Sequence, residues 1–105
     1  MSSLDPSAAD LSSRFESLWH VEGTYAPDAA ETRGPFRSAH VAHLLELMGA
    51  GTLVFVGSFA DVSSSVMVVR AGSEQAALDL FRDDLYLRNG IWVELRARAF
   101  NVLRG

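Results

Sequence analysis

Cysteine is absent from the 105-residue chain, which excludes disulfide bonds, thiolate nucleophiles and cysteine-based metal sites. Basic residues are also few: nine Lys and Arg against thirteen Asp and Glu give a formal net charge of −4. Because an acidic surface repels phosphate backbones and anionic lipids, we expect no nucleic-acid and no membrane partner. Arg96 and Arg98 come closest to a basic patch, and Glu94 stands beside them.

Long apolar runs are missing as well. No stretch reaches the roughly 20 residues that a membrane-spanning helix needs, and the first residues lack the basic start of a signal peptide. We therefore expect a cytoplasmic protein. What the chain does have is apolar content: 49% of its residues are hydrophobic, enough for one packed core. Residues 1–17, rich in Ser, Ala and Asp, predict a flexible or weakly helical tail, and residues 18–105 predict one domain.

The hydrophobic periodicity predicts an α+β domain. A short helix over 7–18 is compatible with the spacing of Leu11, Phe15 and Leu18, and residues 26–34 are expected to form a loop. A helix should begin near Pro35 and end at Gly49–Gly51, and a second should begin with Ser73 as its N-cap and continue to Gly90. Strands are expected over 18–25, 52–57, 65–69 and 91–103. The order βαββαβ predicts a ferredoxin-like fold, with a four-stranded antiparallel sheet and two helices on one face.

The predicted sheet carries apolar residues on both faces. Residues 53–56 and 66–69 are apolar throughout, and alternation along the last strand places Trp92 and Phe100 opposite Ile91, Val93 and Leu95. An uncovered apolar face of this size is unusual in a monomer, so we expect a homodimer that forms through the sheet. The alternative is that the N-terminal segment folds back over this face.

The histidines are the first candidates for chemistry. His40 falls early in the first long helix, where the positive end of the dipole disfavours the imidazolium and leaves the neutral form that a general base needs. A surface or capping histidine explains His40 equally well. His43 shares its helical face, and together with Glu46 could be imagined as metal ligands. The usual zinc spacing on a helix is i,i+4, and a solvated flank also accounts for this pair. His20 has no evident partner.

Two adjacent aspartates form a second candidate. Asp83 and Asp84 are expected at the end of the second helix, where acidic groups oppose the dipole and each other, which raises their pKa values. Simple solvation, or neutralisation by Arg82 and Arg88, is the alternative. Ser65, at the start of the third strand, could hydrogen-bond a ligand or only the turn.

In their order and spacing these residues resemble the YCII-related (YciI-like) family. Residues 37–44 are similar to its Arg-x-x-His-x-x-x-Leu helix start, residues 73–77 to its Ser-x-Glu/Gln-Ala-Ala start, and residues 84–90 to its Asp-Pro-Tyr-x-x-x-Gly motif. Thr24-Tyr25-Ala26-Pro27 also resembles a first-strand ending of many members, and Gly51, Gly57 and Ser65 match single positions. The resemblance spans about Val21 to Leu103. Leu85 replaces the usual proline, Ser64 a common glycine, and Ser58 a common proline.

The resemblance implies a ferredoxin-like dimer with facing sheets and a site built on a His/Asp pair, here His40 and Asp84, with Ser65 nearby. Relatives of this fold include muconolactone isomerase, and one family member eliminates chloride from a chlorinated hydroxyhydroquinone. The hypothesis is therefore a small-molecule enzyme of the isomerase or lyase type that transfers protons without a cofactor or metal. His40 and Asp84 would be catalytic, and Ser65, Arg37 and Tyr86 would bind a small aromatic or lactone-like substrate; Trp92, Tyr25 or Phe59 could line the pocket. The alternative is a non-catalytic dimeric module that binds a small ligand or a partner protein.

Overall fold

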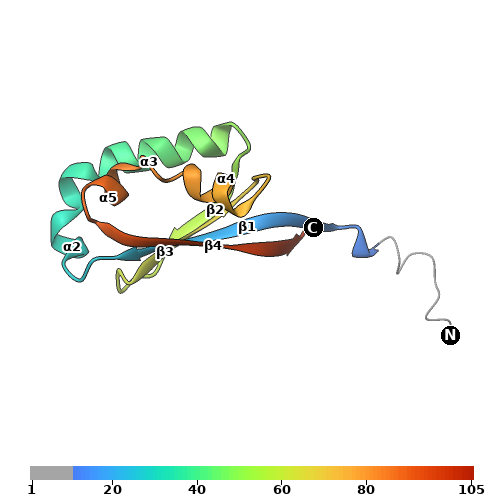
Figure 1. Cartoon of the computed structure of the whole chain (residues 1–105), viewed down its shortest axis with the longest axis horizontal. Coiled ribbons are helices and arrows are strands. Elements are labelled where there is room, and N and C mark those ends of the chain that lie inside the picture. Colours follow the sequence, from blue (N-terminus) through green and yellow to red (C-terminus); the bar gives the residue numbers. More distant parts are fainter. Residues whose placement is uncertain (1–10) are drawn as a thin grey trace.

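The computed structural model describes residues 11–105. Four strands form one antiparallel sheet in the order β2-β3-β1-β4, and every helix lies on the same side of it (Figure 1). The ferredoxin-like α+β architecture is confirmed. The elements along the chain are β1 (Phe15–Tyr25), α2 (Ala29–Thr32), α3 (Gly34–Gly49), β2 (Leu53–Ser58), β3 (Ser64–Val69), α4 (Glu74–Asp79), α5 (Leu85–Arg88) and β4 (Trp92–Leu103).

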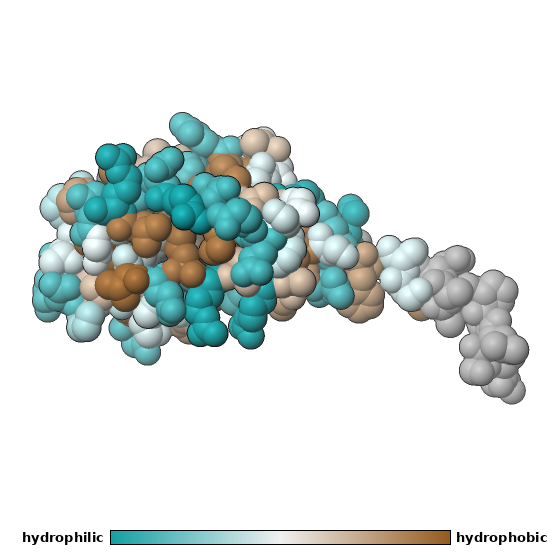
Figure 2. Space-filling model, viewed as in Figure 1, coloured by the Kyte–Doolittle hydropathy of each residue, from teal (hydrophilic) through white to brown (hydrophobic). Residues whose placement is uncertain are grey.

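The hydrophobic core lies between the sheet and the helix layer. Its fully buried side chains include Val21 of β1, Met67 and Val69 of β3, Phe81 after α4 and Trp92 of β4. Figure 2, which views the molecule along an edge of the sheet, shows mainly hydrophilic residues around a group of hydrophobic residues in the middle of this view. No helix of the described residues is long and apolar enough to cross a membrane.

Local signals place the helix ends as expected. Pro35 stands in the first turn of α3, where its missing N–H leaves no hydrogen bond unmade, and Gly51 adopts φ +77° just after the helix. The Ser73 hydroxyl accepts a hydrogen bond from the Ala76 N–H at 3.1 Å and caps α4. The first helix and the start of the second are therefore confirmed.

Strand β1 begins earlier than the sequence predicts. It starts at Phe15, which pairs with Leu103 of β4, so the suggested helix does not extend over residues 15–18. Pairing with the long β4 strand overrides the helical spacing of the apolar residues there. The part of the expected tail over residues 1–10 lies outside the described residues.

The predicted second helix is broken in two. Helix α4 ends at Asp79, and a turn leads to Asp84, which caps the separate helix α5. The single helix expected up to Gly90 is wrong, because the Asp84 carboxylate binds a backbone N–H and starts a new turn instead of continuing the old one. The expected loop over 26–34 also contains α2, whose Ala29 is fully buried.

A β-bulge changes which side chains of β4 face the core. Tyr25 pairs with Trp92 and Thr24 with Glu94, so Val93 is the extra residue. The bulge lets Trp92 pack in the same core as Leu95, while Phe100 contacts His20 on the other face of the sheet. The prediction that Trp92 and Phe100 share a face is wrong, because simple alternation does not hold across a bulge.

The face of the sheet away from the helices carries a shallow apolar groove. No described helix covers this face (Figure 1). Phe55 is 57% exposed and Phe100 is 43% exposed, which is unusual for phenylalanine side chains. The groove is lined by His20, Val54, Phe55, Val66, Val68, Phe100 and Val102.

Candidate active site

Asp84 is the centre of the candidate site, and the break between α4 and α5 places it there. Its backbone is extended, and its Oδ1 accepts a hydrogen bond from the Tyr86 N–H at 2.8 Å. The carboxylate is fully buried under the helix layer. A buried carboxylate needs further hydrogen-bond donors, and α3 provides them.

Two histidines of α3 bind this one carboxylate. The Nδ1 atoms of His40 and His43 lie 2.8 Å from Oδ1 and 2.9 Å from Oδ2 of Asp84, respectively. Their spacing of three residues puts both rings on the face of α3 that meets α5. His40 is buried, whereas a third of the His43 side chain is exposed.

The environment of Asp84 lowers its pKa below the ordinary value. Burial, the largest single effect, favours the neutral acid, but hydrogen bonds from His40, His43 and the Tyr86 N–H together outweigh it. The sequence-based expectation of a raised pKa is wrong for Asp84, because this residue caps the start of α5 and does not end the preceding helix.

An ionised Asp84 determines which nitrogen of each imidazole carries a proton. A carboxylate only accepts hydrogen bonds, so His40 and His43 must each donate from a protonated Nδ1. In the neutral form of His40, the lone pair is then on Nε2. The arrangement gives His40 an oriented nitrogen that can take up a proton, with a negative charge behind it.

Aromatic side chains fix the plane of the His40 ring. It stacks on Tyr86 with ring centroids 3.7 Å apart and planes 11° from parallel, and Trp92 meets it edge-on at 4.9 Å. Trp92 is fully buried, and its Nε1 has no hydrogen-bond partner among the described residues. Packing alone therefore holds Trp92 against His40.

A cavity of about 240 Å³ lies beside His40. His40 forms part of its wall together with Arg37, Ser65 and Tyr86, so the structure brings four of the five predicted site residues to one cavity. Asp84, the fifth, lies behind His40 and does not line it.

Of the other predicted pocket residues, only Tyr25 lines this cavity, where its Oη accepts a hydrogen bond from the Ser65 hydroxyl at 2.8 Å. Trp92 packs behind His40, and Phe59 lies on a separate shallow groove at the β2–β3 turn.

Sequence reasoning missed two residues of this region. His43 was considered only as a metal ligand or a solvated residue, although its spacing from His40 already placed both rings on one face. Arg33, which lines the cavity, gave no signal, because its position depends on how α2 meets α3. Among residues 11–105, no group of three or more His, Asp or Glu side chains is placed to hold a metal ion.

The family model described as the YCII-related domain matches residues 18–101. The chain belongs to this family. Among curated proteins, the YCII-related domain is 34% identical over 83 residues to the derivative of benzaldehyde biosynthesis cluster protein C of Emericella nidulans. That match covers 69% of this chain and 85% of the relative.

A solved structure shares the fold of this YCII-related domain. It is 5-chloro-2-hydroxyhydroquinone dehydrochlorinase (TftG) from Burkholderia phenoliruptrix AC1100, in complex with 2,5-dihydroxybenzoquinone. The TM-score is 0.67 at 16% sequence identity, over 79% of this chain and 92% of the other.

Proposed function

We propose that this YCII-related domain is a small-molecule enzyme that transfers protons without a cofactor, in an isomerisation or elimination. The observation that carries the proposal is the buried His40–Asp84 pair, with 2.8 Å between Nδ1 and Oδ1, at the wall of a cavity. A histidine oriented by a carboxylate is the arrangement that general acid–base catalysis uses.

The chemistry follows from the two nitrogens of His40. Nε2 takes a proton from the substrate while Nδ1 keeps its hydrogen bond to Asp84, whose negative charge stabilises the imidazolium. In an isomerisation of the muconolactone-isomerase kind, the same proton returns to a different carbon. In an elimination of the dehydrochlorinase kind, the electron pair of the broken C–H bond forms a double bond as chloride leaves with its bonding pair.

Three other residues have binding roles in this proposal. Arg37 offers hydrogen-bond donors to polar groups of the substrate, and the Ser65 hydroxyl offers an acceptor, because its proton is donated to Tyr25. Tyr86 supports the His40 ring while presenting its own surface to the cavity. The substrate class is a small aromatic-derived or lactone-like molecule. The dehydrochlorinase that shares the fold, and whose solved structure holds 2,5-dihydroxybenzoquinone, supports this choice.

We further propose that the domain acts as a cytoplasmic homodimer that forms through the sheet. The uncovered apolar groove supports the dimer. The rival hypothesis is a non-catalytic module that binds a ligand or partner without turning it over.

Turnover of chlorinated hydroxyhydroquinones and small lactones by the wild type and by His40→Ala tests the enzymatic proposal. General acid–base catalysis contributes roughly 10²–10⁴-fold, so the variant should lose about that factor while retaining its fold by circular dichroism. Glu46→Ala, an exposed change on the same helix, should keep full activity. Equal turnover by wild type and His40→Ala would rule out the assigned role of His40. Binding of a compound at His40 without turnover of any would favour the non-catalytic module.

A further inference from the structure

The cavity of about 240 Å³ beside His40 has two arginines in its wall, whereas a second cavity that His40 also lines is bordered by three aspartates, Asp79, Asp83 and Asp84. Arg33 and Arg37 both line the first cavity, and no Asp or Glu does. Within residues 11–105, no ion pair joins either guanidinium to a carboxylate. The chain as a whole has a net charge of −4, so a cavity wall with two arginines and no acidic residue differs in sign from the rest of the chain.

The N-terminus of α3 disfavours cations at both arginine positions, although Arg33 also caps the C-terminus of the four-residue helix α2, where a cation is favoured. Arg33 is the N-cap of α3, Arg37 lies in its first turn, and that turn contains no acidic residue. Cations near the N-terminus of a helix oppose its dipole, which costs stability. A residue placed against its local preference indicates a functional reason, and the positive end of α3 adds to the charge of the two arginines.

Two aromatic residues of the cavity, Tyr25 and Tyr86, lie close to the arginines. The Arg33 guanidinium lies 5.9 Å from the centroid of the Tyr25 ring, in cation–π range. Burial raises the pKa of Tyr86 most, Tyr25 and the Asp84 carboxylate add to the rise, and the charges of Arg33 and Arg37 act against it. Tyr86, which stacks on His40, therefore experiences the charges of both guanidiniums as well as that of Asp84.

The rest of the cavity wall is largely apolar. Val41, Leu44, Leu45 and Met48 of α3 line it, and Val56 of β2 adds to this surface. A ligand that fits both parts has a flat apolar body and a negatively charged group at one end. The planar guanidinium group of arginine donates paired N–H hydrogen bonds that match a carboxylate or another anionic oxygen attached to a ring.

We propose that this cavity selects anions: a small ring compound that carries a carboxylate or an ionised hydroxyl, bound by Arg33 and Arg37 with its ring toward His40. The inference rests on the proposed function, since it names the substrate class of the same site. It concerns binding, however, and is tested without turnover.

The test compares probes of equal size that differ in charge. ¹⁵N-labelled full-length protein is titrated with benzoate and with benzamide, and at higher pH with 4-nitrophenolate and with 4-nitroaniline. At least one anion should bind about tenfold or more tightly than its neutral partner, with shifts at Arg33, Arg37 and Tyr86. Whichever anion is preferred distinguishes a carboxylate from an ionised hydroxyl. Raising the salt concentration from about 0.05 M to about 0.5 M should weaken binding of the anion and leave binding of the neutral probe unchanged.

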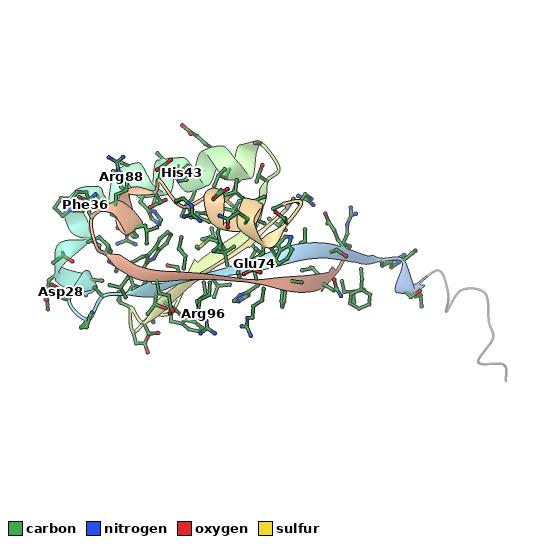
Figure 3. The ribbon with its side chains drawn as sticks, in the orientation of Figure 1. Asp28, Phe36, His43, Glu74, Arg88 and Arg96 are labelled. Atoms are coloured by element: carbon green, nitrogen blue, oxygen red, sulfur yellow. The ribbon has the colours of Figure 1, made fainter. Side chains whose placement is uncertain are left out.

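A matched pair of variants isolates the cavity charge. Arg33→Gln with Arg37→Gln should abolish the preference for the anion. Arg14→Gln with Arg96→Gln makes the same change in net charge at exposed residues that do not line the cavity, and should keep the preference. Arg96 projects from the side of the sheet opposite to the helices (Figure 3).

Each outcome is decisive for the inference. Equal affinity of the wild type for charged and neutral probes, or no shift at the cavity with any anion, would overturn it, whether or not the variants fold. Anion binding in a protein that turns over no substrate would support the inference while the enzymatic proposal fails. Turnover of a substrate by a wild type that binds charged and neutral probes equally would support the enzymatic proposal while the inference fails.

Discussion

At the scale of single residues, the site depends on one carboxylate that two histidines share. The sequence predicted His40 and Asp84 as a pair, largely through a family resemblance, and the structure places them in hydrogen-bond contact. It could not predict that His43 would bind the second oxygen, because that contact depends on where the chain turns between α4 and α5. The spacing of the histidines was visible; the position of their acceptor was not.

Asp84 makes stability depend on pH in the acid range. The pKa of Asp84 is lower in the folded chain than in the unfolded chain, so its contribution to the free energy of unfolding is fully present above the unfolded-state pKa and is lost as the pH falls through the lowered pKa. Asp84→Asn should therefore cost about 1–3 kcal/mol at neutral pH, and the difference from wild type should shrink below about pH 4.

Urea unfolding at several pH values measures this difference. Asp83→Asn, at an exposed neighbouring position, should change the free energy of unfolding by less than about 0.5 kcal/mol at neutral pH. A constant difference between wild type and Asp84→Asn from neutral to acid pH would contradict the role of the Asp84 charge.

His43 should stabilise the site although it does not line the cavity of the proposed reaction. His43→Ala leaves Oδ2 of a fully buried carboxylate without its donor, which should cost about 1–3 kcal/mol of unfolding free energy. Glu46→Ala, one turn further along α3 and exposed, is the matched control and should be close to neutral. If the thermal unfolding curves of His43→Ala and Glu46→Ala coincide, the His43–Asp84 hydrogen bond contributes nothing to stability.

At the scale of elements, the strands and long helix follow from sequence patterns, and the exceptions have local causes. Alternation and caps predicted β2, β3 and α3 closely. The split of the second helix required knowing that Asp84 binds the Tyr86 N–H, and the placement of Trp92 required the bulge at Val93. Both features bring side chains to the site, and neither leaves a periodic signal in the chain.

Gly23 of β1 is required for Trp92 to reach His40. A Cβ on Gly23 would lie 2.7 Å from Cε2 of Trp92, closer than carbon atoms approach without displacement. Gly23→Ala should therefore destabilise the fold by roughly 1–3 kcal/mol and shift the His40 ring resonances, since Trp92 contacts that ring.

Gly57→Ala is the control for this change, because a Cβ there meets nothing closer than 3.8 Å. It should change the free energy of unfolding by at most about 1 kcal/mol. Unperturbed His40 resonances in a folded Gly23→Ala variant would contradict the link between the glycine, Trp92 and the site.

At the scale of the whole molecule, the helices protect one face of the sheet and leave the other apolar. The sequence predicted this two-faced character from the runs at 53–56 and 66–69, and the structure shows the resulting groove. The sequence of one chain does not identify the molecule that covers the groove, because binding there also depends on the surface of the partner.

The proposed dimer predicts the effect of charges in the groove. Phe55→Lys combined with Phe100→Lys places two cations among apolar side chains that a sheet–sheet interface would bury. In sedimentation velocity the wild type should have twice the chain mass and this variant the chain mass. Leu45→Lys, a 61% exposed position on the helix side, should remain dimeric. A monomeric wild type, or a double variant that remains dimeric, would contradict the sheet interface.

In the proposed reaction, Nε2 of His40, oriented by Asp84, moves a proton on a small molecule. The most direct measurement is hydrogen–deuterium exchange at the acidic carbon of a bound lactone or hydroxyquinone in D₂O, followed by NMR. The wild type and His20→Gln, which alters a histidine on the other face of the sheet, should exchange this proton at equal rates. His40→Gln should be slower by at least about 10²-fold. Exchange by His40→Gln at the wild-type rate would contradict the account.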